Sequence, residues 1–249
     1  MTSVQWLRAD WPAPADIVAG TTLRQGGVSA GRYLSLNLAE HVGDDRHSVQ
    51  TNRRRFHDAC GLPAEPLWLS QAHGKVVVPA ESAEDVPRAD AIVATRADTV
   101  CAILTADCLP VLFACDDGTA IAAAHAGWRG LCEGVLEETV AALPGTPSTI
   151  LAWLGPAISQ PAFEVGSEVR ERFLAYDDGA AAAFRENDRS RWQADLYQLA
   201  RLRLCKAGVT RIFGGGRCTF SEPGAFFSYR RDGECGRMAT FVFSRKCLK

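Results

Sequence analysis

The sequence predicts an α+β fold in which mixed and antiparallel sheets are flanked by helices. Strand and helix patterns alternate along the chain without the regular strand–helix–strand rhythm that a parallel sheet requires. Two apolar runs, 100–115 and 120–126, flank an Asp-Asp-Gly-Thr turn at 116–119, a pattern typical of an antiparallel hairpin. Neither a repeat nor a clear linker divides the sequence, so residues 1–249 are expected to form a single domain.

Apolar runs bounded by turn residues predict six further strands. They are expected within 1–20 and at 67–80, 91–95, 149–154, 211–213 and 239–244. The strand at 67–80 would carry His73, which Gly74 follows. In the hairpin, Pro110 cannot donate a backbone hydrogen bond, so the first hairpin strand is expected to be an edge strand or to be interrupted there.

Helical spacing of apolar residues, together with stop signals, predicts five helices. They cover 45–60, 131–143, 164–176, 179–184 and 193–207. In the third helix Val165, Val169 and Phe173 recur at i, i+4 and i+8 and would face the core. Trp128 and Arg129 precede the second helix, where backbone N–H groups can receive an anion, although core packing is an equally good role for Trp128.

The composition is that of an ordinary globular protein, with 47% hydrophobic and 22% charged residues. A net charge of −2 and a pI of about 6.2 give no overall attraction for nucleic acid or an anionic membrane. The first residues lack a signal-peptide core, and no run of about 18 uncharged apolar residues predicts a membrane span. Nine cysteines without a C-x-x-C pair favour free thiols and a reducing cytoplasm.

Cys108 and His125 are the chemically reactive pair of the predicted hairpin. Closing the hairpin about residues 116–119 puts the two on the same or neighbouring rungs, where Cβ atoms lie roughly 4.5–5.5 Å apart. At that separation a thiol and an imidazole can share one metal ion or one proton. The pair would lie beside Pro110, where the sheet opens.

Three interpretations of these residues together with His73 remain open on the residues alone. Two imidazoles and a thiolate with an open fourth position would form a catalytic zinc site, and the same donors suit copper. Alternatively, Cys108 is a nucleophile and His125 is its base, oriented by Asp107 or another acceptor. In the third interpretation a buried cysteine and two hydrogen-bonded histidines have no chemical role. A ligated thiolate is a poor nucleophile, so the first two interpretations compete for one sulfur atom.

The glycine-rich segment 21–45 lets the backbone approach a ligand closely. Its polar groups with the most binding potential are Arg24, Asn37 and His41. A surface turn without a ligand is the alternative interpretation of the same segment.

Eight sequence motifs follow one another between about residue 20 and residue 243. They are, in order, TTLRQGGVS, SLNLAEHVGDD, QAHGKVV, ADAIV, LTADCLPVLF, AAHAGWRG, LGPAI with FEVGSEV, and FFSYRRDG. Together they resemble the YfiH-like family, also called the laccase-domain or polyphenol-oxidase family. The resemblance implies a single α+β domain with a metal site, usually zinc, whose ligands match His73, Cys108 and His125.

The resemblance also implies an enzyme. Family members are described as phosphorylases of adenosine, inosine or methylthioadenosine and as adenosine deaminases. An older description is copper-dependent oxidation of polyphenols, and a bacterial branch is described as an editing factor that hydrolyses wrongly built peptidoglycan precursors.

Physical chemistry ranks these activities. Multicopper oxidation of the laccase type needs roughly ten histidines, whereas this chain has five. A single zinc-type ion suits deamination, because it can activate water for attack on a purine ring. We therefore expect a cytoplasmic, zinc-dependent phosphorylase of purine nucleosides with adenosine deamination as a second activity. The alternative is an amidase of peptidoglycan precursors that uses Cys108 or a metal-activated water.

Phosphorolysis assigns roles to side chains in the matched motifs. Arg24, Arg129 and Arg230 are expected to hold phosphate as bidentate donors. Phe227 or Trp128 is expected to stack on the purine base. The expected partners are therefore a nucleoside and phosphate, with neither nucleic acid nor a membrane.

Overall fold

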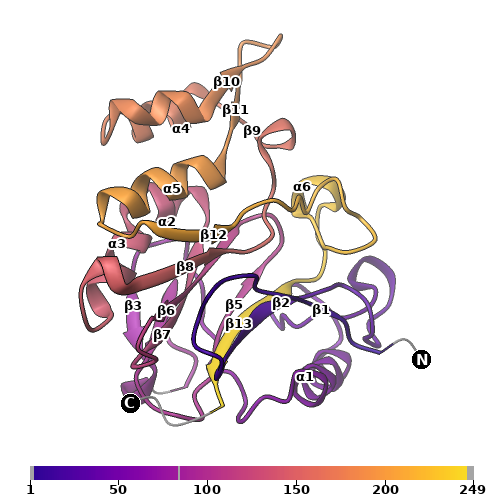
Figure 1. The fold of residues 1–249 in the computed structure, drawn as a ribbon. Helices are drawn as coiled ribbons and strands as arrows, with labels where there is room; N and C mark the ends of the chain where they lie inside the picture. Colours follow the sequence, from indigo (N-terminus) through magenta and orange to yellow (C-terminus); the bar gives the residue numbers. More distant parts are fainter. Residues whose placement is uncertain (1–2, 84, 246–249) are drawn as a thin grey trace.

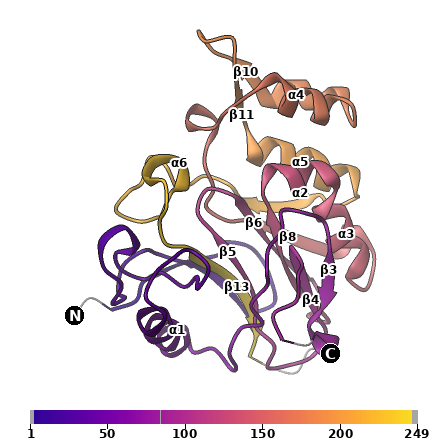
Figure 2. The ribbon, with the colours of Figure 1, turned by 180° about the vertical axis from the view of Figure 1, so that it is seen from behind.

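A computed structural model describes residues 3–83 and 85–245. Two sheets pack face to face and helices cover the outer face of each, which gives four layers (Figure 1). Helix α1 (Arg46–Cys60) lies on the smaller sheet. Helices α2 (Trp128–Glu133), α3 (Val135–Ala142) and α5 (Leu196–Lys206) lie on the larger one, as both views show (Figures 1 and 2).

The larger sheet has six strands in the order β12-β8-β6-β7-β4-β3. These strands are, in that order, Arg211–Gly214, Ile150–Leu154, Leu109–Cys115, Ile121–Ala126, Ala91–Ala94 and Val77–Pro79. The outer pairs, β12 with β8 and β3 with β4, are parallel, whereas the three inner pairs are antiparallel. The sheet is therefore mixed, as predicted.

The smaller sheet is antiparallel throughout and has the order β1-β2-β13-β5. Its strands are, in that order, Trp6–Arg8, Ile17–Thr22, Met238–Ser244 and Cys101–Thr105. A third, antiparallel sheet stands beside α4 (Ser167–Leu174) at one end of the molecule (Figure 1). Its strands are β10 (Phe184–Glu186), β11 (Trp192–Ala194) and β9 (Glu164–Val165). The predicted α+β class with mixed and antiparallel sheets is confirmed.

Short helical turns connect these elements. They are α6 (Tyr229–Asp232) and the 3₁₀ helices Gly31–Tyr33, Ala80–Ser82, Pro147–Thr149, Gln160–Ala162 and Asp178–Ala183. In the part of the chain that the structure describes, no helix combines the length and apolar character needed to cross a membrane.

Apolar side chains fill the interfaces between the layers. Between the two sheets, Ile103 packs with Leu112 and Trp153. On the outer face of the smaller sheet, Phe56 of α1 packs edge-on against Phe241, with ring centroids 5.1 Å apart. Full burial of each such side chain contributes about 1.5–3 kcal/mol, so these interfaces hold the layers that carry the site in place.

Helix α1 has the boundaries that the sequence predicts. The Asp45 carboxylate accepts the backbone N–H of Ser48 and caps the first turn. Gly61, in a left-handed conformation with φ of 61°, ends the helix. These are local signals, so the prediction for 45–60 is confirmed.

The central hairpin is β6–β7, in which Pro110 pairs with His125. The apolar run 100–115 is nevertheless two strands, because the chain leaves the smaller sheet after β5 and enters the larger sheet at β6. Of the two alternatives predicted near Pro110, the structure has the interruption, between β5 and β6, and not the edge, since β6 lies between β7 and β8. Pro110 is the second residue of the strand, where a missing N–H is tolerated, and its carbonyl accepts the Gly155 N–H at 2.9 Å.

Two predicted helices have other boundaries than expected, since helical structure near 131–143 already begins at Trp128 and α4 begins later than predicted. The segment 131–143 contains a break at Gly134, whose left-handed φ of 102° separates α2 from α3. Helix α4 begins only at Ser167, so Val165 belongs to strand β9 and not to the helix face. Val169 and Phe173 are buried on α4 as predicted.

Three further predictions need correction. The segment 179–184 forms a 3₁₀ helix that ends where β10 begins. The helix predicted over 193–207 starts later, because its first residues pair in β11 and Asp195 caps α5. The strand predicted at 67–80 is confined to β3, so His73 lies in the turn before that strand.

Candidate metal centre and substrate pocket

His73, Cys108 and His125 converge where the hairpin meets α2, and we call them the donor triad. Cys108 directly precedes β6, His125 lies near the end of β7, and His73 comes from the turn before β3. One donor atom from each residue lies within 4.8 Å of the other two. Cys108 Sγ is 4.0 Å from His73 Nε2, and the two imidazole rings meet edge to face at 4.8 Å. The structure thus brings together the three residues that the sequence singled out.

A buried carboxylate fixes the orientation of His125. Asp90 Oδ1 lies 2.8 Å from His125 Nδ1, and the two side chains are 1% and 3% exposed. This contact leaves Nε2 of His125 for the Cys108 side of the ring. The sequence prediction missed Asp90, although it lies in the ADAIV motif.

Charge pairing inside the triad favours a thiolate. Burial opposes ionisation of Cys108, but the two histidines outweigh it and lower the thiol pKa to about 6. Burial also opposes charge on His125, but the Cys108 thiolate and Asp90 raise the pKa of the imidazole to about 9. A thiolate is the form of cysteine that binds a metal, and a divalent cation can replace the imidazole proton beside it.

Two glycines shape the space around the donors. A Cβ atom on Gly127 would come within 3.1 Å of both Cys108 Sγ and His73 Cδ2. A Cβ atom on Gly130 would lie 2.5 Å from the Gly74 carbonyl oxygen, so the glycine lets α2 approach the His73 turn. Three nitrogen and sulfur donors around space kept free of side chains fit a zinc-type ion with an open position.

A pocket of about 420 Å³ opens onto the donor triad. Its other lining residues are His41, Gln71, Leu104, Thr105, Ala106, Asp107, Trp128, Arg129, Ile158, Phe163, Tyr229, Arg230 and Arg237. The volume lies in the range of small-molecule sites, about 300–1,000 Å³. The lining joins candidate metal donors, guanidinium groups and aromatic rings in one cavity. Phe163, Tyr229 and Arg237 were not predicted, although Tyr229 directly precedes Arg230 in the FFSYRRDG motif.

Asp107 does not contact the His125 ring, and the other acceptor that the prediction allowed is Asp90. Asp107 Oδ1 accepts the Thr219 hydroxyl at 2.6 Å, and its Oδ2 accepts the Arg230 backbone N–H at 2.7 Å. The residue has a left-handed φ of 91° and lines the pocket. Its carboxylate therefore links the pocket floor to α6, while Asp90 takes the position beside His125.

Arg24, Asn37 and Phe227 do not line the pocket, in contrast to the prediction. Arg24 donates to the backbone carbonyls of Leu34 and Pro223, and its guanidinium lies 4.6 Å from the centre of the Phe227 ring. Phe227 is 0% exposed, so it has no free face for a base. Asn37 is fully buried; its amide NH₂ donates to the Ala39 carbonyl, and its amide oxygen accepts the Ala39 backbone N–H. These side chains stabilise the loops behind the site.

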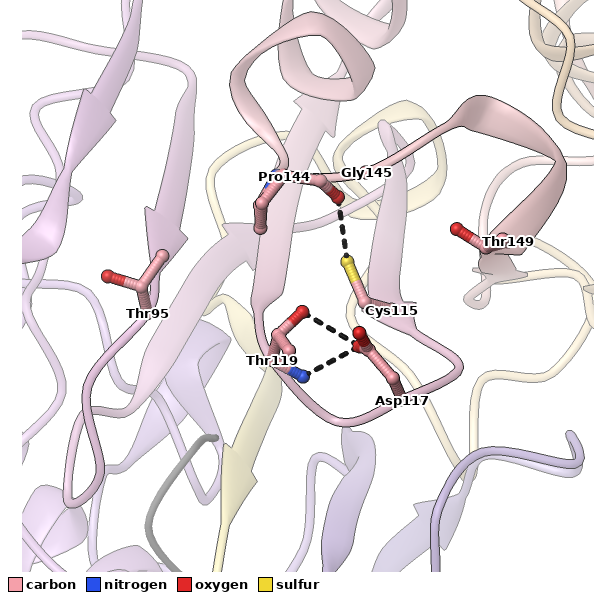
Figure 3. A pocket seen from close by; sticks show the side chains of 7 residues that line it. All are labelled: Thr95, Cys115, Asp117, Thr119, Pro144, Gly145 and Thr149. Atoms are coloured by element: carbon pink, nitrogen blue, oxygen red, sulfur yellow. Dashed lines mark hydrogen bonds between the residues drawn. The ribbon is translucent and has the colours of Figure 1, made fainter.

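A second cavity of about 410 Å³ lies at the opposite end of the β6–β7 hairpin (Figure 3). The Cys115 thiol there donates to the Pro144 carbonyl at 3.3 Å. Asp117 accepts the backbone N–H and the hydroxyl of Thr119. The seven lining residues drawn include no imidazole and only this one, hydrogen-bonded thiol, so the cavity has no counterpart of the donor triad.

The chain is similar to known proteins over nearly its whole length. Residues 18–245 match the family model described as multi-copper polyphenol oxidoreductase laccase. An Escherichia coli protein named purine nucleoside phosphorylase YfiH is 54% identical over 234 residues, which cover 94% of this chain and 96% of the relative. A Haemophilus influenzae protein named purine nucleoside phosphorylase is 46% identical over 242 residues, which cover 96% and 99%.

Solved structures show the same fold. A Neisseria meningitidis protein matches with a TM-score of 0.93 and 50% identity, and the match covers 97% of this chain and 99% of that one. YlmD from Geobacillus stearothermophilus matches with a TM-score of 0.89 and 32% identity, with 99% and 98% covered.

Proposed function

The chain belongs to the multi-copper polyphenol oxidoreductase laccase family, as its motifs indicated, and we propose that it is a purine nucleoside phosphorylase, as its YfiH-like relatives are named. One observation carries the proposal: a single pocket joins three candidate metal donors to guanidinium groups and aromatic rings. Phosphorolysis must bind an anion, a sugar and a flat base together, and guanidinium groups suit the anion while aromatic rings suit the base.

Zinc is the metal we propose for the donor triad. Two imidazoles and a thiolate are typical zinc donors, and copper accepts the same set. A metal at His73, Cys108 and His125 would supply Lewis acidity to an oxygen atom of a bound substrate. The five histidines of the chain are too few for a laccase-type copper cluster, which needs roughly ten. The family description alone therefore does not make polyphenol oxidation the expected activity.

Arg129 and Arg230 are the proposed phosphate donors. Both line the pocket, and planar guanidinium groups bind phosphate oxygens in pairs. Arg129 lies over the Trp128 ring at 4.5 Å, and Arg230 uses one N–H on the Glu164 carbonyl. These contacts orient each guanidinium group and leave its other N–H groups available to phosphate oxygens. Phosphate held here would form a bond to sugar C1′ as the bond from C1′ to the base breaks.

Aromatic rings at the same pocket are the proposed platform for the base. Trp128, Phe163 and Tyr229 line it, and Tyr229 is 56% exposed. The exposed ring of Tyr229 is accessible to a purine base, and stacking would bury apolar surface of both rings. Asp107 adds carboxylate oxygens that can accept sugar hydroxyls. We expect this chemistry in the cytoplasm, in keeping with the eight free cysteines among the described residues.

Incubation of inosine and adenosine with and without phosphate tests the function directly. We expect free hypoxanthine and adenine only when phosphate is present, together with one pentose 1-phosphate for each base released. Chromatography of the products measures both. Base release that is equal with and without phosphate would contradict phosphorolysis.

The same samples separate the other activities. Inosine formed from adenosine would support deamination, which we propose as a second activity of the same pocket. If neither nucleoside reacts but peptidoglycan precursors release amino acids, the amidase is the function.

Replacing Arg129 or Arg230 by alanine should raise the KM for phosphate by about 10- to 100-fold, because a charged hydrogen bond contributes about 1.5–3 kcal/mol. Initial rates over a phosphate series measure this change. Arg211 pairs with Asp116 at the other end of the sheet and is the matched control. Arg24→Ala should instead lower stability, because Arg24 bonds backbone carbonyls. An unchanged phosphate KM in both pocket variants would exclude them from phosphate binding.

A further inference from the structure

Asp90 contacts two members of the donor triad through one carboxylate. Its Oδ1 accepts His125 Nδ1 at 2.8 Å and the backbone N–H of His73 at 2.9 Å. Its Oδ2 accepts the backbone N–H of Gly74 at 2.7 Å and of Ala72 at 3.2 Å. The side chain is 1% exposed, so all four contacts are made away from water.

The contacts to residues 72–74 hold the turn that presents His73. His73 has a left-handed φ of 60°, which a residue with a Cβ rarely adopts without support. Three consecutive N–H groups point at the Asp90 carboxylate, and they supply that support. The main-chain conformation of His73 therefore depends on a residue in the segment leading into β4.

The contacts to His125 fix both its backbone and its ring. The His125 backbone N–H donates to the Asp90 carbonyl at 2.7 Å, while the ring donates to the Asp90 carboxylate. Asp90 thus holds the end of β7 in place and sets the His125 tautomer whose Nε2 is available to a metal.

From these contacts we propose that Asp90 is a positioning residue that locks His73 and His125 into one metal-binding geometry. The inference rests on the proposed metal site and not on which reaction the enzyme performs. Without Asp90 the two imidazoles are held by unrelated segments, and their spacing is no longer set by a common group.

Asp90→Asn is the sharpest substitution, because it keeps the size of the side chain and cannot satisfy all four donors. Each carboxylate oxygen accepts two N–H groups. Whichever way the amide is turned, its NH₂ group faces two donors, either at His73 and His125 or at Ala72 and Gly74. The turn at 72–74 therefore loses at least one hydrogen bond in either orientation, and in the first orientation His125 loses its partner as well.

We expect the metal-free variant to bind Zn²⁺ about 10- to 100-fold more weakly than the wild type, the usual effect of losing a group that orients a ligand. Competition with a chromogenic chelator measures the affinity. With Co²⁺ as the probe, the thiolate charge-transfer band from Cys108 should remain while the ligand-field bands change, because the imidazoles shift and the sulfur does not.

Glu81→Gln is the matched control. Glu81 is a carboxylate beyond the other end of β4 that accepts the backbone N–H groups of Thr95 and Arg96 and the Thr95 hydroxyl. Its substitution should lower the melting temperature of the metal-free protein without changing Zn²⁺ affinity. A role of Asp90 in stability alone would give the same pattern for Asp90→Asn and would overturn the inference. Failure of the wild type to bind Zn²⁺ would reject the metal site itself.

Hydrogen exchange in the metal-free wild type gives a test that needs no variant. The amides of His73 and Gly74 belong to a surface turn, yet bonding to a buried carboxylate should slow their exchange at least tenfold relative to the Lys75 amide. Equal exchange at all three positions would contradict the proposed lock.

Discussion

Replacing His125 by alanine will lower phosphorolysis of inosine by about a thousandfold, since a Lewis-acid site is worth several kcal/mol of barrier and each 1.4 kcal/mol is tenfold. The substitution removes one of three donors and leaves the buried carboxylate of Asp90 without its imidazole partner. Zinc content after dialysis should fall with the rate. Initial rates at saturating phosphate and elemental analysis of the same sample measure the two effects.

His57→Ala is the control for that experiment. His57 lies on α1, is about two-fifths exposed and pairs with the neighbouring carboxylate of Asp58. Its removal should leave the rate and the zinc content within a factor of two of the wild type. If His125→Ala keeps more than a tenth of the wild-type rate, the donor triad is not the reaction centre.

Replacing Gly127 by alanine is expected to weaken Zn²⁺ binding by about ten- to a hundredfold, the range that follows disturbance of ligand geometry. The residue has φ of −59°, which any amino acid can adopt, so the effect comes from contact and not from backbone strain. The new methyl group would press on Cys108 Sγ and His73 Cδ2, both 3.1 Å away. Chelator competition measures the affinity.

Gly216→Ala separates this contact from a general effect of adding a methyl group. An added Cβ at Gly216 meets nothing within 4 Å. Zinc affinity and melting temperature should both stay near those of the wild type. Equal zinc affinity in Gly127→Ala and Gly216→Ala would mean that the donors do not lie as close to Gly127 as the structure has them.

Local signals predicted the parts of the site that lie close together in the sequence. The Asp-Gly turn fixed the hairpin, and the hairpin brought Cys108 to His125. The residues alone left the role of His73 open among three interpretations, and the resemblance to a family favoured the metal ligand, because nothing near His73 in sequence indicates that a turn would carry it to the hairpin. The interruption of the run 100–115 was correctly predicted near Pro110. Pro110 itself lies inside β6, which is an inner strand, and the sequence could not show this because strand order depends on contacts across the whole chain.

Other residues were misassigned for the same reason, namely that long-range contacts decide which side chains reach the site. Asp107 is next to Cys108 in sequence, but Asp90, 35 residues before His125, holds the imidazole because β4 pairs with β7. Arg24 and Phe227 have the side chains that phosphate and purine binding need. Only the tertiary structure shows that they stack on each other behind the pocket. Residue type gave the chemistry, while long-range pairing decided which residue performs it.

The chain passes from the smaller sheet to the larger one just before Cys108, so a metal ion bound by the donor triad would also hold this crossing in place. Two donors belong to the larger sheet and its preceding turn, and the third is at the crossing point between the two sheets. A cation that binds the folded protein there would increase its free energy of unfolding. Binding of a metal ion there would then stabilise the folded protein, in addition to any part that it has in catalysis.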